Sequence, residues 1–169
     1  MFRKGDTVVH PEHGAAVIEE LREREILGER RKYLVLRVAY GDLTLMVPVE
    51  STEEVGLREV VSKSEVKKVL DVLRQDESKM AANWSRRFKN NIEKLRSGDI
   101  YQVAEVVRNL SIRERDRGLS AGEKRMITKA RQILISELTY ATAGTEEKAE
   151  AMIDKVLDES HQARVLQGA

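Results

Sequence analysis

Alternating hydrophobic and polar residues mark the first third of the chain as β-structure. Because side chains two positions apart share one face of a strand, the alternation predicts strands at residues 6–10, 14–25, 31–40 and 43–49. The strand at 31–40 has apolar residues on both faces: Tyr33, Val35 and Arg37 on one, and Leu34, Leu36 and Val38 on the other. We therefore expect that strand to be mostly buried.

Turn and loop residues separate these strands. Gly28 and Gly41 supply turns between the later strands. The sequence His-Pro-Glu-His-Gly at residues 10–14 predicts a loop, in which Pro11 interrupts strand pairing and Gly14 permits a backbone conformation that other residues resist. Short strands within about 50 residues are typical of a small twisted barrel of the Tudor or SH3 type.

From Ser62 onward the apolar residues recur every three or four positions, which predicts helices. Capping residues divide this part of the chain into helices at residues 62–75, 84 to about 97, 100–117, 120–141 and 146–160, with Ser62, Asp99, Ser120 and Thr145 as N-caps and Gly118 as a stop. Residues 161–169 are expected to fray. The chain is thus predicted to be α+β, with a small β-barrel at residues 1–60 and an all-α domain of about five helices at residues 61–169.

Composition narrows the class of protein. The 169 residues are 35% charged and only 4% aromatic, so the core must consist mainly of aliphatic side chains. There is no cysteine, which excludes disulfides and thiolate chemistry and suits a reducing compartment. No apolar run is long enough to span a bilayer, and the first residues lack the apolar stretch of a signal peptide. We expect an intracellular protein of the cytoplasm.

The charge is distributed unevenly. Residues 81–131 contain 13 Lys and Arg against 6 Asp and Glu, a net charge of +7, whereas residues 1–80 carry −2 and residues 132–169 carry −4. A basic block between acidic ends is typical of a surface that binds a polyanion such as nucleic acid. A helical surface with uneven, solvated charge is an equally open interpretation.

The only tryptophan, Trp84, opens that basic block beside three cations. It shares a helical stripe with Phe88, Ile92 and Leu95, which favours a core position at the start of its helix. Alternatively, a ring at the edge of the stripe can project past the domain, as an apolar wedge flanked by cations that are free to meet solvent or phosphate. These cations are Arg86, Arg87 and Lys89.

A second basic cluster opens the helix at 120–141. Lys124, Thr128 and Arg131 share one face of it, and Arg125 adds a further charge. Cations in a first turn oppose the helix dipole, which is easier to understand if they meet an anion. An ordinary amphipathic helix is the alternative.

Signals of catalysis or cofactor binding are poor. His10 and His13 have H-x-x-H spacing but no third ligand placed near them, so we expect neither a metal site nor a bound cofactor. No phosphate-binding glycine loop is present, and no nucleophile is paired with a base. We expect a binding protein and not an enzyme.

Several stretches together resemble the CarD/CdnL family of bacterial transcription regulators. They lie in the family's order from residue 2 to about residue 140 and include KGDTVVHPEHGAA, YLVLRVAYGDLTLMVPVE, VGLREVV, NWSRRFKNNIEKLRSGD, VAEVVRNL and RGLSAGEKRMITKARQIL. The resemblance implies a Tudor-like domain that binds the β subunit of RNA polymerase. It also implies a helical domain that contacts promoter DNA at the upstream edge of the transcription bubble, in a nucleoid-associated protein that we expect to act as a monomer.

The resemblance also assigns residues to these two surfaces. Trp84 would wedge at the upstream fork from the minor-groove side, with basic neighbours as DNA contacts: Arg86, Arg87, Lys89, Lys124 and Arg125. The polymerase would meet Arg24 and an edge strand that offers Leu43, Thr44, Leu45, Met46 and Val47 for pairing. Relatives carry Arg at the position of Met46, so a charged contact there is missing in this chain.

Three functions remain open on the sequence alone. The resemblance favours a polymerase-bound protein that stabilises the open promoter complex. A DNA-binding architectural protein would need no polymerase, and it would bind duplex tightly by itself. An adapter would recruit polymerase through its barrel while Trp84 stays in the core.

Overall fold

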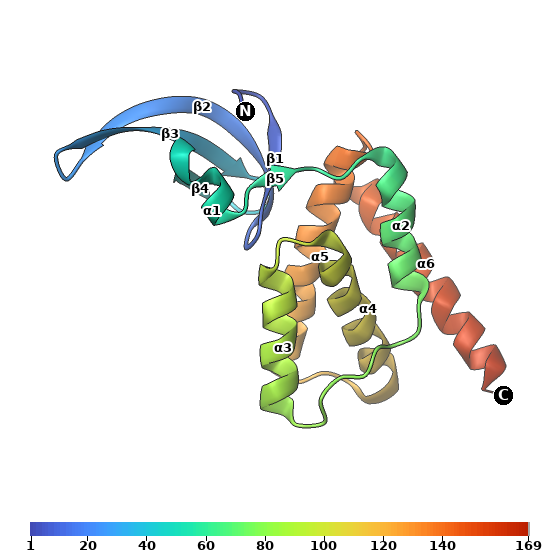
Figure 1. Cartoon of the computed structure of the whole chain (residues 1–169). Helices are drawn as coiled ribbons and strands as arrows, with labels where there is room; N and C mark the ends of the chain where they lie inside the picture. The colour runs from blue at the N-terminus through green and yellow to red at the C-terminus, as the bar shows by residue number, and fades with distance from the viewer. Residues whose placement is uncertain (169) are drawn as a thin grey trace.

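Five antiparallel strands form the N-terminal part of the protein in the computed structural model, which describes residues 1–168 (Figure 1). In sheet order they run β4 (Thr44–Pro48), β3 (Glu29–Val38), β2 (Gly14–Ile26), β1 (Thr7–His10) and β5 (Arg58–Glu59). Two short helical turns, η1 (Val49–Ser51) and α1 (Thr52–Val55), connect β4 to β5. The four predicted strands are confirmed, whereas β5 was missed because two residues are too few to show alternation.

The inner face of the sheet forms a small aliphatic core, as the predicted Tudor-like domain requires. Its buried members come from every strand but β5, with one residue from the segment before β5: Val8, Ala16, Ile18, Leu34, Leu36, Val38, Val47 and Leu57. The outer strands of the sheet are β4 and β5, so β4 presents one backbone edge that is not paired with β3.

Beyond this core, β2 and β3 continue as a two-stranded ribbon that projects away from the domain (Figure 1). Its turn is Leu27–Gly28, and both residues have positive φ, 54° and 81°. A two-residue hairpin turn needs this left-handed pair so that its twist matches that of the strands. Arg24 lies on the ribbon, with Nη1 3.9 Å from Sδ of Met46 on β4.

Five helices follow, as the sequence predicts: α2 (Lys63–Arg74), α3 (Trp84–Arg96), α4 (Ile100–Arg117), α5 (Ala121–Ala141) and α6 (Glu146–Gln167). The four predicted N-caps each accept a hydrogen bond from a backbone N–H of the first turn, and Ser120 with Glu123 completes a capping box. The predicted boundary between residues 60 and 61 falls between β5 and α2.

The expectation that residues 161–169 fray is wrong for residues 161–167, which continue α6. Gln, Ala, Arg and Leu are good helix formers, and no breaker intervenes before Gly168, so the helix runs on past its last buried turn. Ala169 lies outside the described residues.

The helices surround α4, which packs against α2, α3, α5 and α6. More than half of its residues are buried, among them Val103, Ala104, Val106, Val107 and Leu110. The helical core is larger than the sheet core, and it holds α3 and α5 in fixed positions beside each other.

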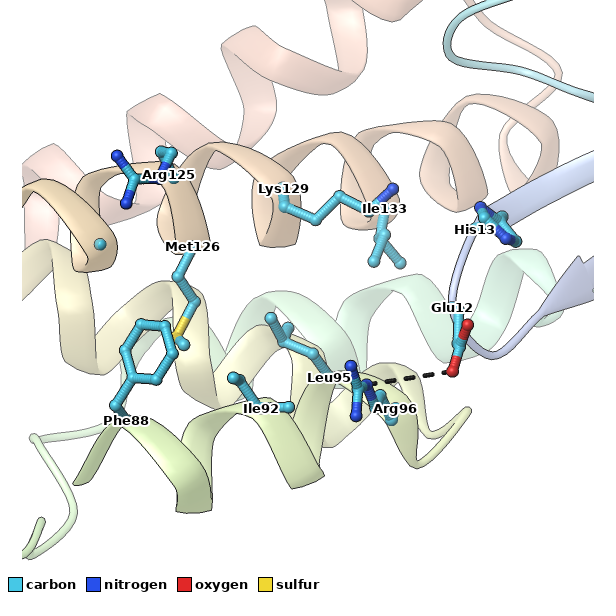
Figure 2. Close-up of a pocket in the computed structure, with 11 residues that line it drawn as sticks. Glu12, His13, Phe88, Ile92, Leu95, Arg96, Arg125, Met126, Lys129 and Ile133 are labelled. Carbon is cyan, nitrogen blue, oxygen red and sulfur yellow. Dashed lines mark ion pairs between the residues drawn. The ribbon is translucent and has the colours of Figure 1, made fainter. Parts of the chain in front are cut away.

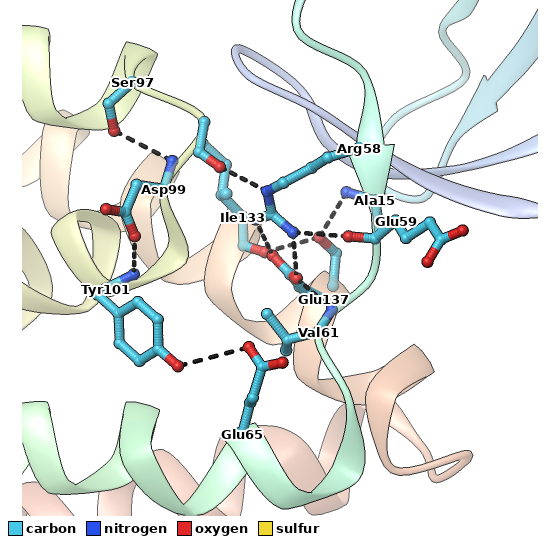
Figure 3. Close-up of polar contacts among 12 residues, drawn as sticks. Ala15, Arg58, Glu59, Val61, Glu65, Ser97, Asp99, Tyr101, Ile133 and Glu137 are labelled. Atoms are coloured by element: carbon cyan, nitrogen blue, oxygen red, sulfur yellow. Dashed lines mark hydrogen bonds and ion pairs between the residues drawn. The ribbon is translucent and has the colours of Figure 1, made fainter.

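A partly buried ion pair joins the sheet to the helices (Figure 3). Arg58 on β5 donates through Nη2 to Oε1 of Glu137 at 2.6 Å and through Nη1 to Oε2 at 2.7 Å. Glu137 lies on α5, is fully buried, and also accepts from the backbone N–H of Val61 at 2.9 Å. The Nε of Arg58 donates to the carbonyl of Gly98, at 2.6 Å. One guanidinium thus connects the sheet to α5 and to the turn between α3 and α4.

Close backbone approach makes the same junction tight. Gly14 has a φ of 77°, and a Cβ there would lie 2.8 Å from Oγ of Ser136 and 3.2 Å from Cα of Ile133. The neighbouring Ala15 N–H donates to Oγ of Ser136 at 3.1 Å. Because a side chain at position 14 would collide with α5, glycine is required both for its conformation and for the contact.

We predict that Arg58→Ala destabilises the protein by about 3 kcal/mol or more, because it leaves the Glu137 carboxylate buried without its counterion. Denaturant-induced unfolding measures the change. Arg22→Ala is the matched control, since Arg22 pairs with Glu20 at a site where both side chains are nearly half exposed, and it should cost less than about 1 kcal/mol. Equal effects of the two variants would contradict this role of Arg58.

Two interacting histidines lie at the connection between β1 and β2: His10 ends β1, and His13 precedes Gly14. The ring centroids of His10 and His13 are 4.8 Å apart. Burial lowers the pKa of His10, and the charge of His13 lowers it further. Burial and the charge of Lys129 lower the pKa of His13, while Glu12 opposes both shifts more weakly. The backbone N–H of Glu12 also donates to Nδ1 of His10, which favours the neutral ring.

We predict that acidification destabilises the protein through these histidines. Above the unfolded pKa of about 6.5 both states hold neutral rings, whereas below it the unfolded chain takes up protons first, so stability falls as pH falls. The unfolding free energy should drop less between pH 7 and pH 5.5 in a His10→Gln, His13→Gln variant than in the natural chain. Identical slopes in the natural chain and in this double variant would contradict the prediction.

Candidate nucleic-acid interface

Trp84 is the first residue of α3, and its position is set by the segment that precedes it. Asn83 caps the helix by accepting from the backbone N–H of Arg86 at 3.0 Å, a cap that the sequence analysis overlooked although Asn is a favoured residue there. Residues 75–83 contain no helix or strand. Ser78 ties this segment to α4, because its N–H donates to Oδ1 of Asn109 and its hydroxyl accepts from Nδ2.

The indole of Trp84 lies half-exposed between α3 and the start of α5. The side chain is 45% exposed, and its ring stacks on Phe88 with centroids 4.9 Å apart and an interplanar angle of 17°. Its Nε1 donates to Oγ of Ser120 at 3.1 Å. Gly122 lies against the stacked rings: a Cβ there would lie 3.5 Å from the indole, an ordinary contact, and 3.3 Å from Cε2 of Phe88. Trp84 is thus held in place without being enclosed. Its position lies between the two alternatives left by the sequence, because the ring is neither in the core nor projecting free of the domain.

Arg87 contradicts the expectation that it is free to meet solvent or phosphate. Its side chain is 5% exposed and directed into the domain, where Nε donates to Oε2 of Glu123 at 3.1 Å. Its Nη1 donates to the carbonyls of Ala81 and Ala82. Arg87 is buried because its position on α3, three residues after Trp84, directs it toward α5. There it meets the buried carboxylate of Glu123, which no local sequence pattern indicated.

Glu123 places a negative charge in the first turn of α5. Burial by itself would raise the pKa of this carboxyl, but the hydrogen bond from Arg87 and those from Ser120 outweigh burial and lower it. The carboxylate therefore stays ionised at neutral pH and satisfies the first turn of the helix. The expected phosphate site at this helix N-terminus is consequently already filled by the protein's own carboxylate.

Four of the predicted DNA contacts remain available on the surface around Trp84. Their side chains are exposed, and within the described residues none has a carboxylate within 4.0 Å: Arg86, Lys89, Lys124 and Arg125. Arg131, which shares the face of Lys124 in sequence, instead pairs with Asp154 and Glu150 of α6. The structure thus brings together one half-exposed indole and cations from α3 and α5.

The predicted polymerase-facing residues lie on the ribbon (Arg24), just before β4 (Leu43) and on β4 (Thr44 to Val47), and β4 lies well away from α3 (Figure 1). Arg24, Leu43 and Thr44 are exposed, while Leu45 and Met46 are half-buried. Val47 is 5% exposed and belongs to the core of the sheet. A partner could therefore reach Val47 only through its backbone, on the unpaired edge of β4.

No three His, Asp or Glu side chains between residues 1 and 168 come together as a metal site would require. No helix in the same range combines the length and apolar character needed to cross a bilayer.

Comparison with known proteins assigns both parts of the chain. The family model for the "CarD-like/TRCF RID domain" matches residues 2–61, and that for "CarD, C-terminal domain" matches residues 68–154. The chain is 35% identical over 148 residues to the putative transcription factor YdeB of Bacillus subtilis (strain 168), covering 88% of this chain and 97% of that protein. A solved structure, "CdnLNt from Myxoccoccus xanthus", is 32% identical over 37% of this chain and 87% of that one, with a TM-score of 0.32. The chain belongs to the CarD/CdnL family of transcription regulators.

Proposed function

We propose that the protein is a non-enzymatic regulator that binds the β subunit of RNA polymerase and stabilises the open promoter complex. Its N-terminal sheet would dock on polymerase, and Trp84 would wedge into the DNA at the upstream fork of the bubble, from the minor-groove side. The observation that carries the proposal is the half-exposed indole, anchored on one face and one edge, on a helix that with α5 also carries exposed cations without carboxylate partners among the described residues.

The anchoring of Trp84 supports a role for its ring in preference to its N–H. The stack on Phe88 covers one face of the indole, and the hydrogen bond to Ser120 uses its only donor. The other face of the ring is therefore the part that could stack on a base. An apolar face can stack on a base only where the duplex is unpaired or kinked. Because the ring is already oriented, little side-chain entropy is lost when a base stacks on it.

If Trp84 binds unpaired DNA more tightly than duplex, the protein shifts the equilibrium between closed and open promoter complexes toward the open one. A ligand moves an equilibrium between closed and open complexes only by its difference in affinity for the two. Stacking of about 1–3 kcal/mol would raise the open-to-closed ratio roughly 5- to 150-fold. Cations such as Arg86, Lys89 and Lys124 attract phosphates of either complex, so they raise occupancy more than they favour opening.

Docking through the sheet would bring the indole to the fork at high effective concentration. The matched RID domain supports a polymerase contact, and the unpaired edge of β4 offers main-chain groups to a polymerase strand. Arg24, 3.9 Å from Met46, adds an exposed charge beside that edge. With this tether, weak and sequence-independent DNA affinity is sufficient.

We predict that Trp84→Ala abolishes the gain in open-complex lifetime. Loss of the stack and of one hydrogen bond should lower the free energy of unfolding by about 1–2 kcal/mol, well below the cost of removing a core tryptophan. Dissociation of polymerase–promoter complexes, followed with a competitor, measures the lifetime. Trp84→Phe keeps a stacking ring and should retain part of the effect. An unchanged lifetime with Trp84→Ala would refute the wedge and favour the adapter.

We predict that Arg24→Glu weakens binding to polymerase while leaving duplex affinity of the isolated chain unchanged. Its charge reversal lies beside the β4 edge and far from Trp84, so it affects the tether alone. Arg74→Glu, at an exposed site on α2, is the matched control and should bind polymerase normally. If the natural chain binds duplex tightly without polymerase, and Arg24→Glu has no effect on opening, the architectural DNA-binding function is correct instead.

A further inference from the structure

We propose that the groove between α3 and α5 binds an unpaired nucleotide of the strand that is released beside Trp84. This inference rests on the proposed function and extends it: the protein would hold single-stranded DNA in a built site, in addition to wedging the fork. The groove has a volume of about 390 Å³, within the range of small-ligand sites (Figure 2).

Apolar side chains from both helices line the groove. Phe88, Ile92 and Leu95 come from α3, and Met126 and Ile133 come from α5 (Figure 2). Phe88 and Ile92 are only half-buried, so the groove leaves part of the α3 stripe uncovered. An aromatic ring and flexible sulfur and aliphatic groups suit the flat face of a base, which stacks without sequence preference.

The groove is continuous with Trp84. Phe88 both lines the groove and stacks on the indole, so an aromatic surface runs from the proposed wedge into the groove. Gly122 also lines the groove, and a Cβ there would crowd Cε2 of Phe88 at 3.3 Å. A strand whose first base stacks on the free face of Trp84 therefore has an apolar site for a neighbouring nucleotide.

Cations border the groove where phosphates would lie. Arg125 and Lys129 are exposed, are one helical turn apart on α5, and within residues 1–168 have no carboxylate within 4.0 Å. Arg96 lies near the far end, 3.9 Å from Glu12, the only carboxylate that lines the groove. His13 lies beside Glu12, and burial, together with the charge of Lys129, lowers the pKa of His13.

This combination favours single-stranded nucleic acid over duplex. A duplex presents phosphates but keeps its base faces stacked, so it could meet Arg125 and Lys129 without filling the apolar floor. An unpaired strand offers both a base face and a phosphate, which matches an apolar groove bordered by two unpaired cations. A fatty-acid anion offers one charge and an acyl chain, and it is distinguished by the experiment below.

The test measures binding of the full-length natural chain to a labelled oligothymidylate, with a duplex of the same length for comparison. Anisotropy reports affinity, and quenching of Trp84, the only tryptophan, reports binding beside the groove. The natural chain should bind the single strand at least about fivefold tighter than the duplex. Dodecanoate should not compete with the oligonucleotide.

Variants separate the contribution of the apolar floor of the groove from that of the cations at its border. Ile92→Gln makes the floor polar without adding charge, and it should weaken single-strand binding about fivefold or more while duplex binding is unchanged. Arg125→Ala with Lys129→Ala should weaken single-strand binding and reduce its salt dependence. Lys67→Ala with Lys155→Ala, two exposed cations elsewhere, is the charge-matched control and should bind both DNAs normally. Melting temperatures confirm that each variant is folded.

Equal affinity for single strand and duplex, or an unchanged affinity in Ile92→Gln, would overturn the groove site. Competition by dodecanoate without single-strand preference would assign the groove to an acyl anion and would also overturn it. Open-complex lifetime keeps the two proposals apart. If Trp84→Ala shortens the lifetime while Ile92→Gln leaves oligothymidylate binding intact, the groove site fails and the wedge stands. If groove variants lose single-strand binding and Trp84→Ala has no effect on lifetime, only the groove site stands.

Discussion

The bidentate ion pair between Arg58 and Glu137 determines how the two parts of the protein sit together. Glu137 is fully buried on α5, and a carboxylate there is tolerated only because a guanidinium and the Val61 N–H satisfy it. Since Arg58 belongs to the last strand of the sheet, the pair can form in one arrangement of sheet and helices only. A misplaced sheet would leave the carboxylate buried and unpaired, which disfavours other arrangements of the sheet and the helices.

That arrangement has a mechanical consequence for the proposed function. The β4 edge and Trp84 are far apart in sequence and in space, and a tether is useful only if it delivers the indole to one place. Gly14 against α5 and the bond from Arg58 to Gly98 connect the sheet directly to the helices that flank Trp84. In the proposed function, the sheet would therefore hold the ring at a set position relative to the docking surface, and docking energy could be used to position the ring.

A second buried pair, Arg87 with Glu123, organises the surface itself. It locks the start of α3 to the start of α5, beside the bond from Trp84 to Ser120, and so fixes the indole and the groove together. The cations of the basic block therefore fall into two groups, those paired inside the domain and those exposed on its surface. Arg87 is used within the domain, whereas Arg86, Lys89, Lys124 and Arg125 stay available, so net charge alone overstates the cationic surface.

The sequence by itself determined four of the five strands, the five long helices, four of their five N-caps and the family, because these follow from side-chain periodicity and from groups within three or four residues of each other. It also identified Trp84 as the residue of interest, but it left open whether the ring is enclosed. The tertiary structure alone decided that Arg86 is exposed while its neighbour Arg87 is buried, that β5 joins the sheet, and that Arg58 finds Glu137. Each of these depends on a partner tens of residues away, and the cost of burying a charge is set by that partner and not by the local pattern.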